Sequence, residues 1–121
     1  MTTAITVVDD SFLSRKMLIK ALPSDWDVEI TQASNGREAL AACRAGKAQV
    51  MFLDLTMPEM DGYQVLEALQ KKGMKTNVIV VSADIQPAAQ QRVKQLGAIA
   101  FVEKSVKIEQ IRTVLAEAGL L

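Results

Sequence analysis

The chain has 121 residues, of which 50% are hydrophobic and 23% charged, a composition typical of one globular domain with its own core. Its 14 lysines and arginines balance 14 aspartates and glutamates, so we expect no direct binding to nucleic acid and no attraction to an anionic membrane. The apolar stretches are strand-sized, shorter than the roughly 20 residues of a membrane span. We therefore expect residues 1–121 to form a single domain with no membrane segment.

The absence of histidine excludes Ser-His-Asp triads, histidine-ligated zinc and a phosphohistidine on this chain. The one cysteine, Cys43, has no partner for an internal disulfide. The N-terminal residues reach Asp9 before a signal-peptide hydrophobic region develops, so a reducing, cytoplasmic location is expected. Any chemistry must use carboxylates, hydroxyls and lysines.

Four short apolar runs predict strands that are buried on both faces, as in a parallel sheet. They are residues 4–8, 50–53, 78–81 and 98–102. A fifth segment, residues 27–31, alternates polar and apolar side chains. This alternation predicts a strand at the edge of the sheet.

Segments of helical periodicity separate the strands, and the first covers residues 11–22. The second begins at Asn35, where Asn35 and Glu38 are expected to form the N-terminal cap, and ends at Gly46. The third runs from residue 62 or 63 to 72, the fourth from Pro87 to Gly97, and the fifth precedes Gly119. The side chains expected to point inward are Leu13, Met17, Leu18, Ala21, Leu40, Cys43, Val65, Leu66, Leu69, Val93, Leu96, Ile108, Ile111 and Leu115.

Alternating strands and helices predict an α/β fold built from parallel βαβ units, with a five-stranded sheet and helices on both faces. Ligand sites in such sheets form at the carboxyl ends of the strands. The sequence places five polar side chains at these ends: Asp9, Asp10, Asp54, Ser82 and Lys104.

A cluster of three carboxylates at one sheet edge calls for a cation, because two unit charges about 4 Å apart repel by about 4 kcal/mol at an effective dielectric of about 20. Oxygen ligands without histidine or thiolate favour Mg²⁺. A divalent cation, the Lys104 ammonium and the Ser82 hydroxyl would stabilise a phosphoryl group in transfer, and an aspartate can accept it as an acyl phosphate. Taken singly, each carboxylate would fit a helix cap equally well.

Several features together carry a family resemblance. They are Asp9-Asp10-Ser11 with Arg15, Asn35-Gly36, the run Asp54-Leu-Thr-Met-Pro-Glu-Met-Asp-Gly62, Ser82 and Lys104. In these features, and over essentially its whole length, the chain resembles a response regulator receiver domain of two-component signalling, of the CheY-like superfamily. The resemblance implies a flavodoxin-like fold with strand order 2-1-3-4-5. It also implies a regulatory phosphoacceptor that catalyses only its own phosphorylation and dephosphorylation, and so is not an enzyme acting on other substrates.

For the metal site, the resemblance implies that Asp54 is the phosphoacceptor and, with Asp10, a direct Mg²⁺ ligand. It implies that Asp9 acts largely through metal-bound water and that the backbone carbonyl of Thr56 completes the ligands from the protein. Ser82 would donate a hydrogen bond to the phosphoryl group, and Lys104 would pair with it.

For signalling, the resemblance implies that Phe101 is the switch residue, although it lacks the ring hydroxyl of the tyrosine found in many motor-binding relatives. The phosphodonor would be a sensor histidine kinase, a histidine phosphotransfer protein or a small acyl phosphate, and a chemotaxis-type phosphorelay is one setting that the resemblance implies. Phe12 is a candidate contact for the donor protein. A downstream target or a fused output domain would bind the face of the fourth helix, fifth strand and fifth helix. Its candidate exposed contacts are Gln91, Lys94, Gln95, Lys107 and Gln110.

One departure from the family concerns Ser105, which stands where the family usually has proline after a cis bond. Because a cis bond before another residue costs about 2.5–4 kcal/mol, we predict a trans Lys104–Ser105 peptide. Lys104 is still expected to reach the Asp54 carboxylate, because its side chain is long.

Two other functions fit parts of the pattern. A Mg²⁺-dependent phosphatase of the haloacid dehalogenase type also uses an aspartate nucleophile, but it usually has a second aspartate where this chain has Thr56, and the chain lacks a cap insertion. A degenerate receiver acting as a constitutive scaffold would have lost some of the five site positions, and all are present. The receiver interpretation is therefore favoured.

Overall fold

Strands and helices alternate along the chain, as the apolar runs and helical segments predict. The computed structural model describes residues 2–121. Its elements are β1 (Thr3–Val8), α1 (Phe12–Lys20), β2 (Val28–Ala33), α2 (Gly36–Arg44), β3 (Val50–Asp54), α3 (Gly62–Lys71), β4 (Asn77–Ser82), α4 (Pro87–Gln95), β5 (Ala100–Glu103) and α5 (Ile108–Glu117).

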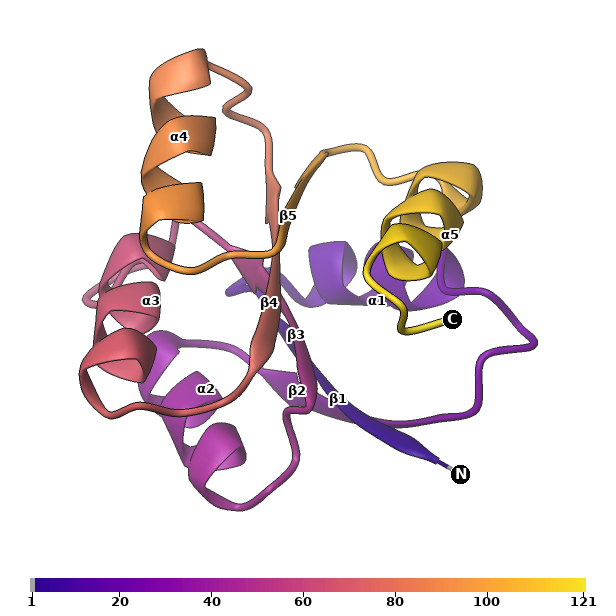
Figure 1. Cartoon of the computed structure of the whole chain (residues 1–121), viewed down its shortest axis with the longest axis horizontal. Helices are drawn as coiled ribbons and strands as arrows, with labels where there is room; N and C mark the ends of the chain where they lie inside the picture. Colours follow the sequence, from indigo (N-terminus) through magenta and orange to yellow (C-terminus); the bar gives the residue numbers. More distant parts are fainter. Residues whose placement is uncertain (1) are drawn as a thin grey trace.

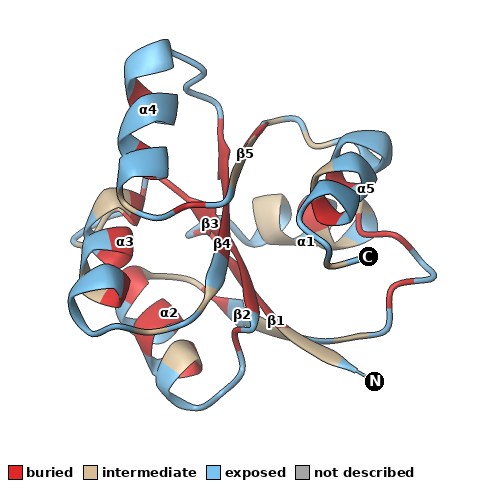
Figure 2. Cartoon of the chain, in the orientation of Figure 1, coloured by how far each residue is buried: buried red, intermediate tan, exposed pale blue. Residues whose placement is uncertain are grey.

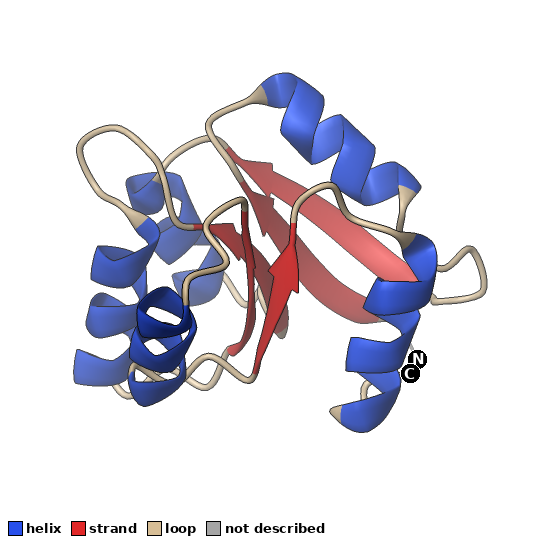
Figure 3. Cartoon of the chain, turned by 90° about the horizontal axis from the view of Figure 1, so that it is seen from above, coloured by secondary structure: helices blue, strands red, loops and turns tan. Residues whose placement is uncertain are grey.

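The strands form one parallel sheet in the order β2-β1-β3-β4-β5. Helices α2, α3 and α4 cover one face and α1 and α5 cover the other, so the sheet is the middle of three layers (Figures 1 and 3). The predicted fold class and strand order are confirmed. The reversal of strand order next to β1 and β3 puts the crevice at the carboxyl ends of these two strands.

The central strands contribute buried side chains to two hydrophobic cores, one on each face of the sheet (Figure 2). All five residues of β3 are buried, and so are all of β4 except Asn77. In β2 only Ala33 is buried, which confirms the edge position predicted from its alternating pattern. Trp26 packs edge-on against Phe52 at a centroid distance of 6.4 Å, in the core between the sheet and helices α1 and α5. The wholly apolar strands thus fix the sheet that carries the polar residues at its edge.

The predicted inward face of the first helix is partly wrong. Leu18 is buried, but Leu13 and Met17 are 63% and 54% exposed. The buried positions are Leu18 in α1 and Leu22 just after its end. Each lies one residue after a predicted inward position, Met17 or Ala21, and one residue is about 100° of rotation on a helix with 3.6 residues per turn. Ile108, at the first position of α5, is also exposed rather than inward.

None of the helices within residues 2–121 has the length and apolar character needed to span a membrane.

Candidate functional site

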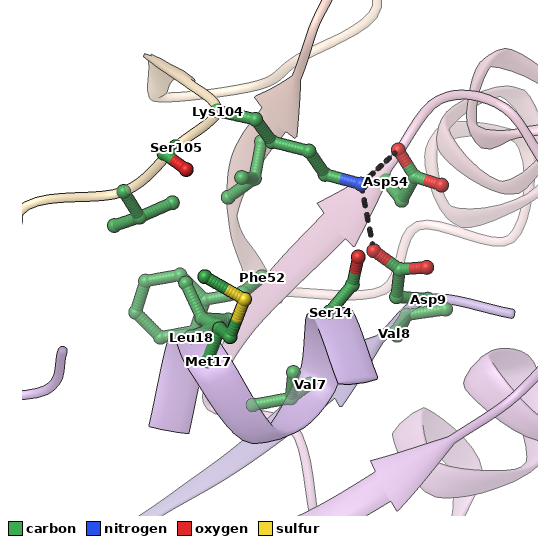
Figure 4. A pocket seen from close by; sticks show the side chains of 12 residues that line it. Val7, Val8, Asp9, Ser14, Met17, Leu18, Phe52, Asp54, Lys104 and Ser105 are labelled. Carbon is green, nitrogen blue, oxygen red and sulfur yellow. Dashed lines mark hydrogen bonds and ion pairs between the residues drawn. The ribbon is translucent and has the colours of Figure 1, made fainter. Parts of the chain in front are cut away.

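The polar residues predicted at the strand ends converge at one edge of the sheet. Asp9 follows β1, Asp54 ends β3, and Lys104 follows β5. The Lys104 ammonium nitrogen lies 2.8 Å from Asp9 Oδ2 and 3.2 Å from Asp54 Oδ1 (Figure 4). Lys104 therefore bridges two carboxylates that approach from neighbouring strands.

Asp10 joins this pair as a third carboxylate. One oxygen from each of Asp9, Asp10 and Asp54 lies within 4.8 Å of the others. Asp9 and Asp54 are buried and Asp10 is exposed, so the cluster opens to solvent on one side. Three carboxylates and one ammonium leave the site with excess negative charge.

Burial is the main cause that raises the pKa of Asp54 above its usual value, and the negative charge of Asp9 raises it further. Lys104 and a backbone hydrogen bond from Thr56 partly oppose this rise. Burial alone would lower the pKa of Lys104, but its hydrogen bond to Asp9 and the charges of Asp54 and Asp9 outweigh burial and raise it. The Asp54 carboxylate is thus incompletely compensated by the protein alone.

This donor set fits Mg²⁺. The three side chains offer only oxygen atoms, and Thr56, whose backbone lies against the Asp54 carboxylate, is exposed in the loop after β3. Hard divalent cations prefer oxygen ligands and compensate clustered carboxylates. The spacing of the oxygens allows one ion to contact more than one of them.

Ser82 ends β4, next to β3, and is 2% exposed. Its hydroxyl oxygen accepts a hydrogen bond from the Asp84 backbone N–H at 3.0 Å, which leaves the hydroxyl proton available for donation. Ser82 and Thr56 line the same shallow groove, between the loops after β3 and β4. The structure thus places Ser82 on the strand next to the phosphoacceptor candidate, without a hydrogen bond to Asp54.

An apolar cavity of about 90 Å³ lies beside the acidic cluster, between α1 and the loop after β5. Met17, Leu18 and Phe52 line it, and Asp9, Asp54 and Lys104 stand at its polar side (Figure 4). The Asp54 side chain is itself buried at the end of β3, which explains why burial dominates its pKa.

The loop after β3 is anchored by contacts that the sequence reasoning missed. Asp61 and Gln64 form a reciprocal capping box at the start of α3, with both hydrogen bonds at 2.9 Å. The spacing Asp-x-x-Gln before an apolar run is the signal that would have predicted it. At Gly36, an added Cβ would lie 2.6 Å from the sulfur of Met60, so the loop packs closely on the start of α2.

The second helix is capped by Asn35, whose side chain accepts from the Glu38 N–H at 2.8 Å. In the expected cap the Glu38 carboxylate would accept a hydrogen bond from the Asn35 backbone N–H, but it accepts from Ser34 instead. Glu38 Oε1 accepts from both the backbone N–H and the hydroxyl of Ser34.

The Lys104–Ser105 peptide is cis, so the predicted trans isomer is wrong. That prediction weighed only the intrinsic preference of an isolated peptide bond, and the fold around Lys104 overrides this local preference. The expected reach of Lys104 to Asp54 is confirmed at 3.2 Å.

Phe101 is half-buried on β5 and packs against the core beneath α2, α3 and α4. It also lines a groove between α4 and β5. The five predicted contact residues of the α4-β5-α5 face are all exposed: Gln91, Lys94, Gln95, Lys107 and Gln110. Phe12 is 66% exposed at the start of α1, with the Arg15 guanidinium 5.8 Å from its ring centroid.

Comparison with known proteins gives a consistent picture. A family model described as "Response regulator receiver domain" matches residues 5–116. The "Protein-glutamate methylesterase/protein-glutamine glutaminase 2" of Koribacter versatilis is 42% identical over 103 residues, covering 83% of this chain and 28% of that protein. The "Probable transcriptional regulatory protein NarL" of Mycobacterium tuberculosis is 34% identical over 113 residues, covering 92% and 52%. The chain thus spans about a quarter to a half of these curated relatives.

Solved structures are similar over nearly the whole chain. The signal receiver domain of the putative response regulator NarL from Mycobacterium tuberculosis has a TM-score of 0.85 at 31% identity, covering 98% of this chain and 97% of that one. The chemotaxis protein CheY4 of Vibrio cholerae has a TM-score of 0.85 at 26% identity, covering 97% and 98%.

Proposed function

The chain belongs to the response regulator receiver domain family, and we propose that it acts as a Mg²⁺-dependent phosphoacceptor whose Asp54 carries the phosphoryl group. A receiver domain is a regulatory module of two-component phosphorelay signalling, whereas the methylesterases among its relatives are named as enzymes. The observation that carries the proposal is the Lys104 bridge between Asp9 and Asp54 within a cluster of three carboxylates.

Asp54 suits the role of nucleophile better than Asp9 does. Both carboxylate oxygens of Asp9 are engaged, Oδ1 by the Ser11 N–H at 2.9 Å and Oδ2 by Lys104 at 2.8 Å. Such contacts hold a side chain in place. Asp54 ends the central strand, and its incompletely compensated charge favours the formation of a new bond to phosphorus.

Asp10, Asp54 and the Thr56 carbonyl would hold the metal ion directly, and Asp9 would act through a water molecule. Bound there, Mg²⁺ would neutralise negative charge on the phosphoryl oxygens. The other side chains of the site then have separate tasks. Asp9 keeps Lys104 oriented, and Lys104 moves its contact from Asp54 to a phosphoryl oxygen.

In the transfer step an Asp54 oxygen bonds to phosphorus as the bond between phosphorus and the donor breaks. The bonding pair leaves with the donor, on an imidazole nitrogen or on the carboxylate oxygen of an acyl phosphate. The Ser82 hydroxyl donates to a phosphoryl oxygen. Hydrolysis of the resulting acyl phosphate by water returns the Asp54 carboxylate and inorganic phosphate.

The partners that we propose are a sensor histidine kinase or a histidine phosphotransfer protein as donor, with Phe12 at the contact, and a target on the α4-β5-α5 surface. Phe101, at the groove between α4 and β5, would couple Asp54 to that surface. Because the curated relatives are longer than this chain, the target is either a separate protein, as in chemotaxis, or an output domain on the same polypeptide.

The test is intact-mass spectrometry after incubation of the full chain with Mg²⁺ and acetyl phosphate. We expect wild type to gain one phosphoryl group, and we expect no gain in EDTA or in Asp54→Asn. Asp84→Asn is the matched control, since Asp84 is an exposed aspartate at the same sheet edge, and it should gain the group as wild type does. An undiminished gain in Asp54→Asn would contradict the proposal.

A further inference from the structure

Arg15 ties the acidic pair to the edge strand. Its Nη1 donates a hydrogen bond to the backbone carbonyl oxygen of Asp9 at 2.6 Å, and its Nε donates to Gln32 Oε1 on β2 at 2.9 Å. The Asp9 N–H donates to the Ala33 carbonyl, also on β2, at 3.1 Å. Strand β1 ends at Val8, so the Asp9 carbonyl lies beyond the strand, and Arg15 supplies its partner from α1.

The carbonyl that Arg15 holds belongs to the peptide group joining Asp9 to Asp10. Because a peptide group is planar and rigid, fixing this carbonyl also fixes the position of the Asp10 Cα atom, from which the Asp10 side chain extends. The side chain of Asp9 has its own hydrogen bonds, to Ser11 and Lys104. Asp10 is exposed, and its carboxylate has no hydrogen-bond partner within residues 2–121.

We propose that Arg15 is a positioning residue for the metal site, acting through the Asp9–Asp10 peptide to keep the Asp10 carboxylate beside those of Asp9 and Asp54. Gln32 accepts a hydrogen bond from the guanidinium and so helps to hold Arg15 in this position. This inference rests on the proposed function, because it assumes that the three carboxylates hold Mg²⁺.

The charge of Arg15 and its hydrogen bonds act on metal binding in opposite directions. A positive charge next to the carboxylates repels a second cation, so loss of the charge alone would tighten Mg²⁺ binding. Loss of the hydrogen bonds frees the peptide group and lets Asp10 leave the cluster, which weakens binding. The sign of the change in Mg²⁺ affinity therefore distinguishes a positioning role from an electrostatic one.

The experiment is calorimetric titration of the metal-free full chain with MgCl₂. We expect Arg15→Gln to weaken Mg²⁺ affinity by about 10-fold, the lower end of the effect measured when a residue that holds a metal ligand in place is lost. Arg15→Lys keeps the repelling charge but loses the two-armed hydrogen bonding, so its Mg²⁺ affinity should also fall below that of wild type. The matched control is Lys16→Gln, which removes a charge from the exposed neighbouring residue and should leave affinity unchanged or slightly tighter.

A readout without metal separates positioning from simple destabilisation. In EDTA, the backbone amide resonances of Asp10 and Ser11 should shift in Arg15→Gln, while that of Trp26, at the far end of the sheet, stays in place. A purely structural role would lower the melting temperature but leave the Mg²⁺ affinity of the folded protein unchanged.

The outcomes are distinct for the two proposals. If wild type binds no Mg²⁺, the proposed function fails. If wild type binds Mg²⁺ and Arg15→Gln binds it equally or more tightly, the role of Arg15 is overturned and the proposed function stands. If Arg15→Gln does not fold, Gln32→Leu decides, because it removes only the anchor of the guanidinium: weaker binding supports the role and unchanged binding overturns it.

Discussion

A Cβ atom on Gly62 would lie 2.5 Å from the carbonyl oxygen of Asp54. It would also lie 2.8 Å from the Cα atom of Leu55, whose carbonyl accepts the Gly62 N–H at 3.0 Å. Helix α3 therefore begins in direct contact with the end of β3. This close approach fixes both the path of the loop after β3 and the backbone position of Asp54.

Substitution of Gly62 tests this contact. We expect Gly62→Ala to lower the free energy of unfolding by about 1–3 kcal/mol, because the added methyl group meets backbone atoms that cannot turn away. Gly36→Ala is the comparison, since its methyl group would meet the flexible Met60 side chain, and its loss should be smaller. Urea unfolding measures both, and a Gly62→Ala protein as stable as wild type would show that the loop yields.

The crowded carboxylates predict an unusual effect at Asp10. In EDTA we expect Asp10→Ala to melt at a higher temperature than wild type, because it removes one of three like charges, while its Mg²⁺ affinity falls. The N-terminal cap of α1 is Ser11, so the substitution removes no cap. Asp61→Ala is the contrasting control: it breaks the capping box of α3 and should destabilise by about 1 kcal/mol. A marked loss of stability in Asp10→Ala would indicate a structural role instead.

The hydrogen bonds to Glu38 indicate that its contribution to the stability of the protein depends on pH. The backbone N–H and the hydroxyl of Ser34 lower the pKa of Glu38 below its usual value. A carboxyl whose pKa is lower in the folded than in the unfolded state adds stability above the unfolded pKa, and that stability is lost as pH falls through the folded pKa. Glu38→Gln should therefore lower the melting temperature at pH 7 and have a smaller effect near pH 3. An equal effect at both pH values would show that ionisation of Glu38 contributes nothing.

Substitution of Phe101 should separate phosphorylation of Asp54 from the change at the α4-β5-α5 surface. We expect Phe101→Ala to accept the phosphoryl group nearly as wild type does, because Phe101 lines the groove between α4 and β5 and not the cavity beside the acidic cluster. The variant should lose coupling to the α4-β5-α5 surface. The measurement is amide chemical shifts before and after phosphorylation. Wild type should show changes across that surface and the variant far fewer. Changes confined to the loop after β3 in wild type would remove the switch role.

The sheet and the acidic cluster could be predicted from the sequence because their signals are local. A short, wholly apolar run such as residues 78–81 favours a buried strand. Parallel strands bring their carboxyl ends to one edge of the sheet. Asp9, Asp54 and Lys104 could thus be placed together from separate segments. Their distances then follow from the register of β1, β3, β4 and β5.

The features that could not be predicted depend on contacts between segments. The rotation of α1 is set by packing against the sheet and α5, which a single helical period does not encode, so Leu13 and Met17 are exposed where buried positions were predicted. The Lys104–Ser105 isomer depends on the surrounding fold. The hydrogen bond from Arg15 to the Asp9 carbonyl involves a backbone atom, and backbone partners have no residue-type signal.

The most direct test of the central claim is to find which carboxylate carries the phosphoryl group. The chain would be treated with Mg²⁺ and acetyl phosphate, the acyl phosphate reduced with borohydride, and the modified residue located by peptide mass spectrometry. We predict a single modified residue, Asp54, and none in Asp54→Asn. Modification at Asp9 or Asp10, or at no aspartate in the wild-type chain, would contradict the account.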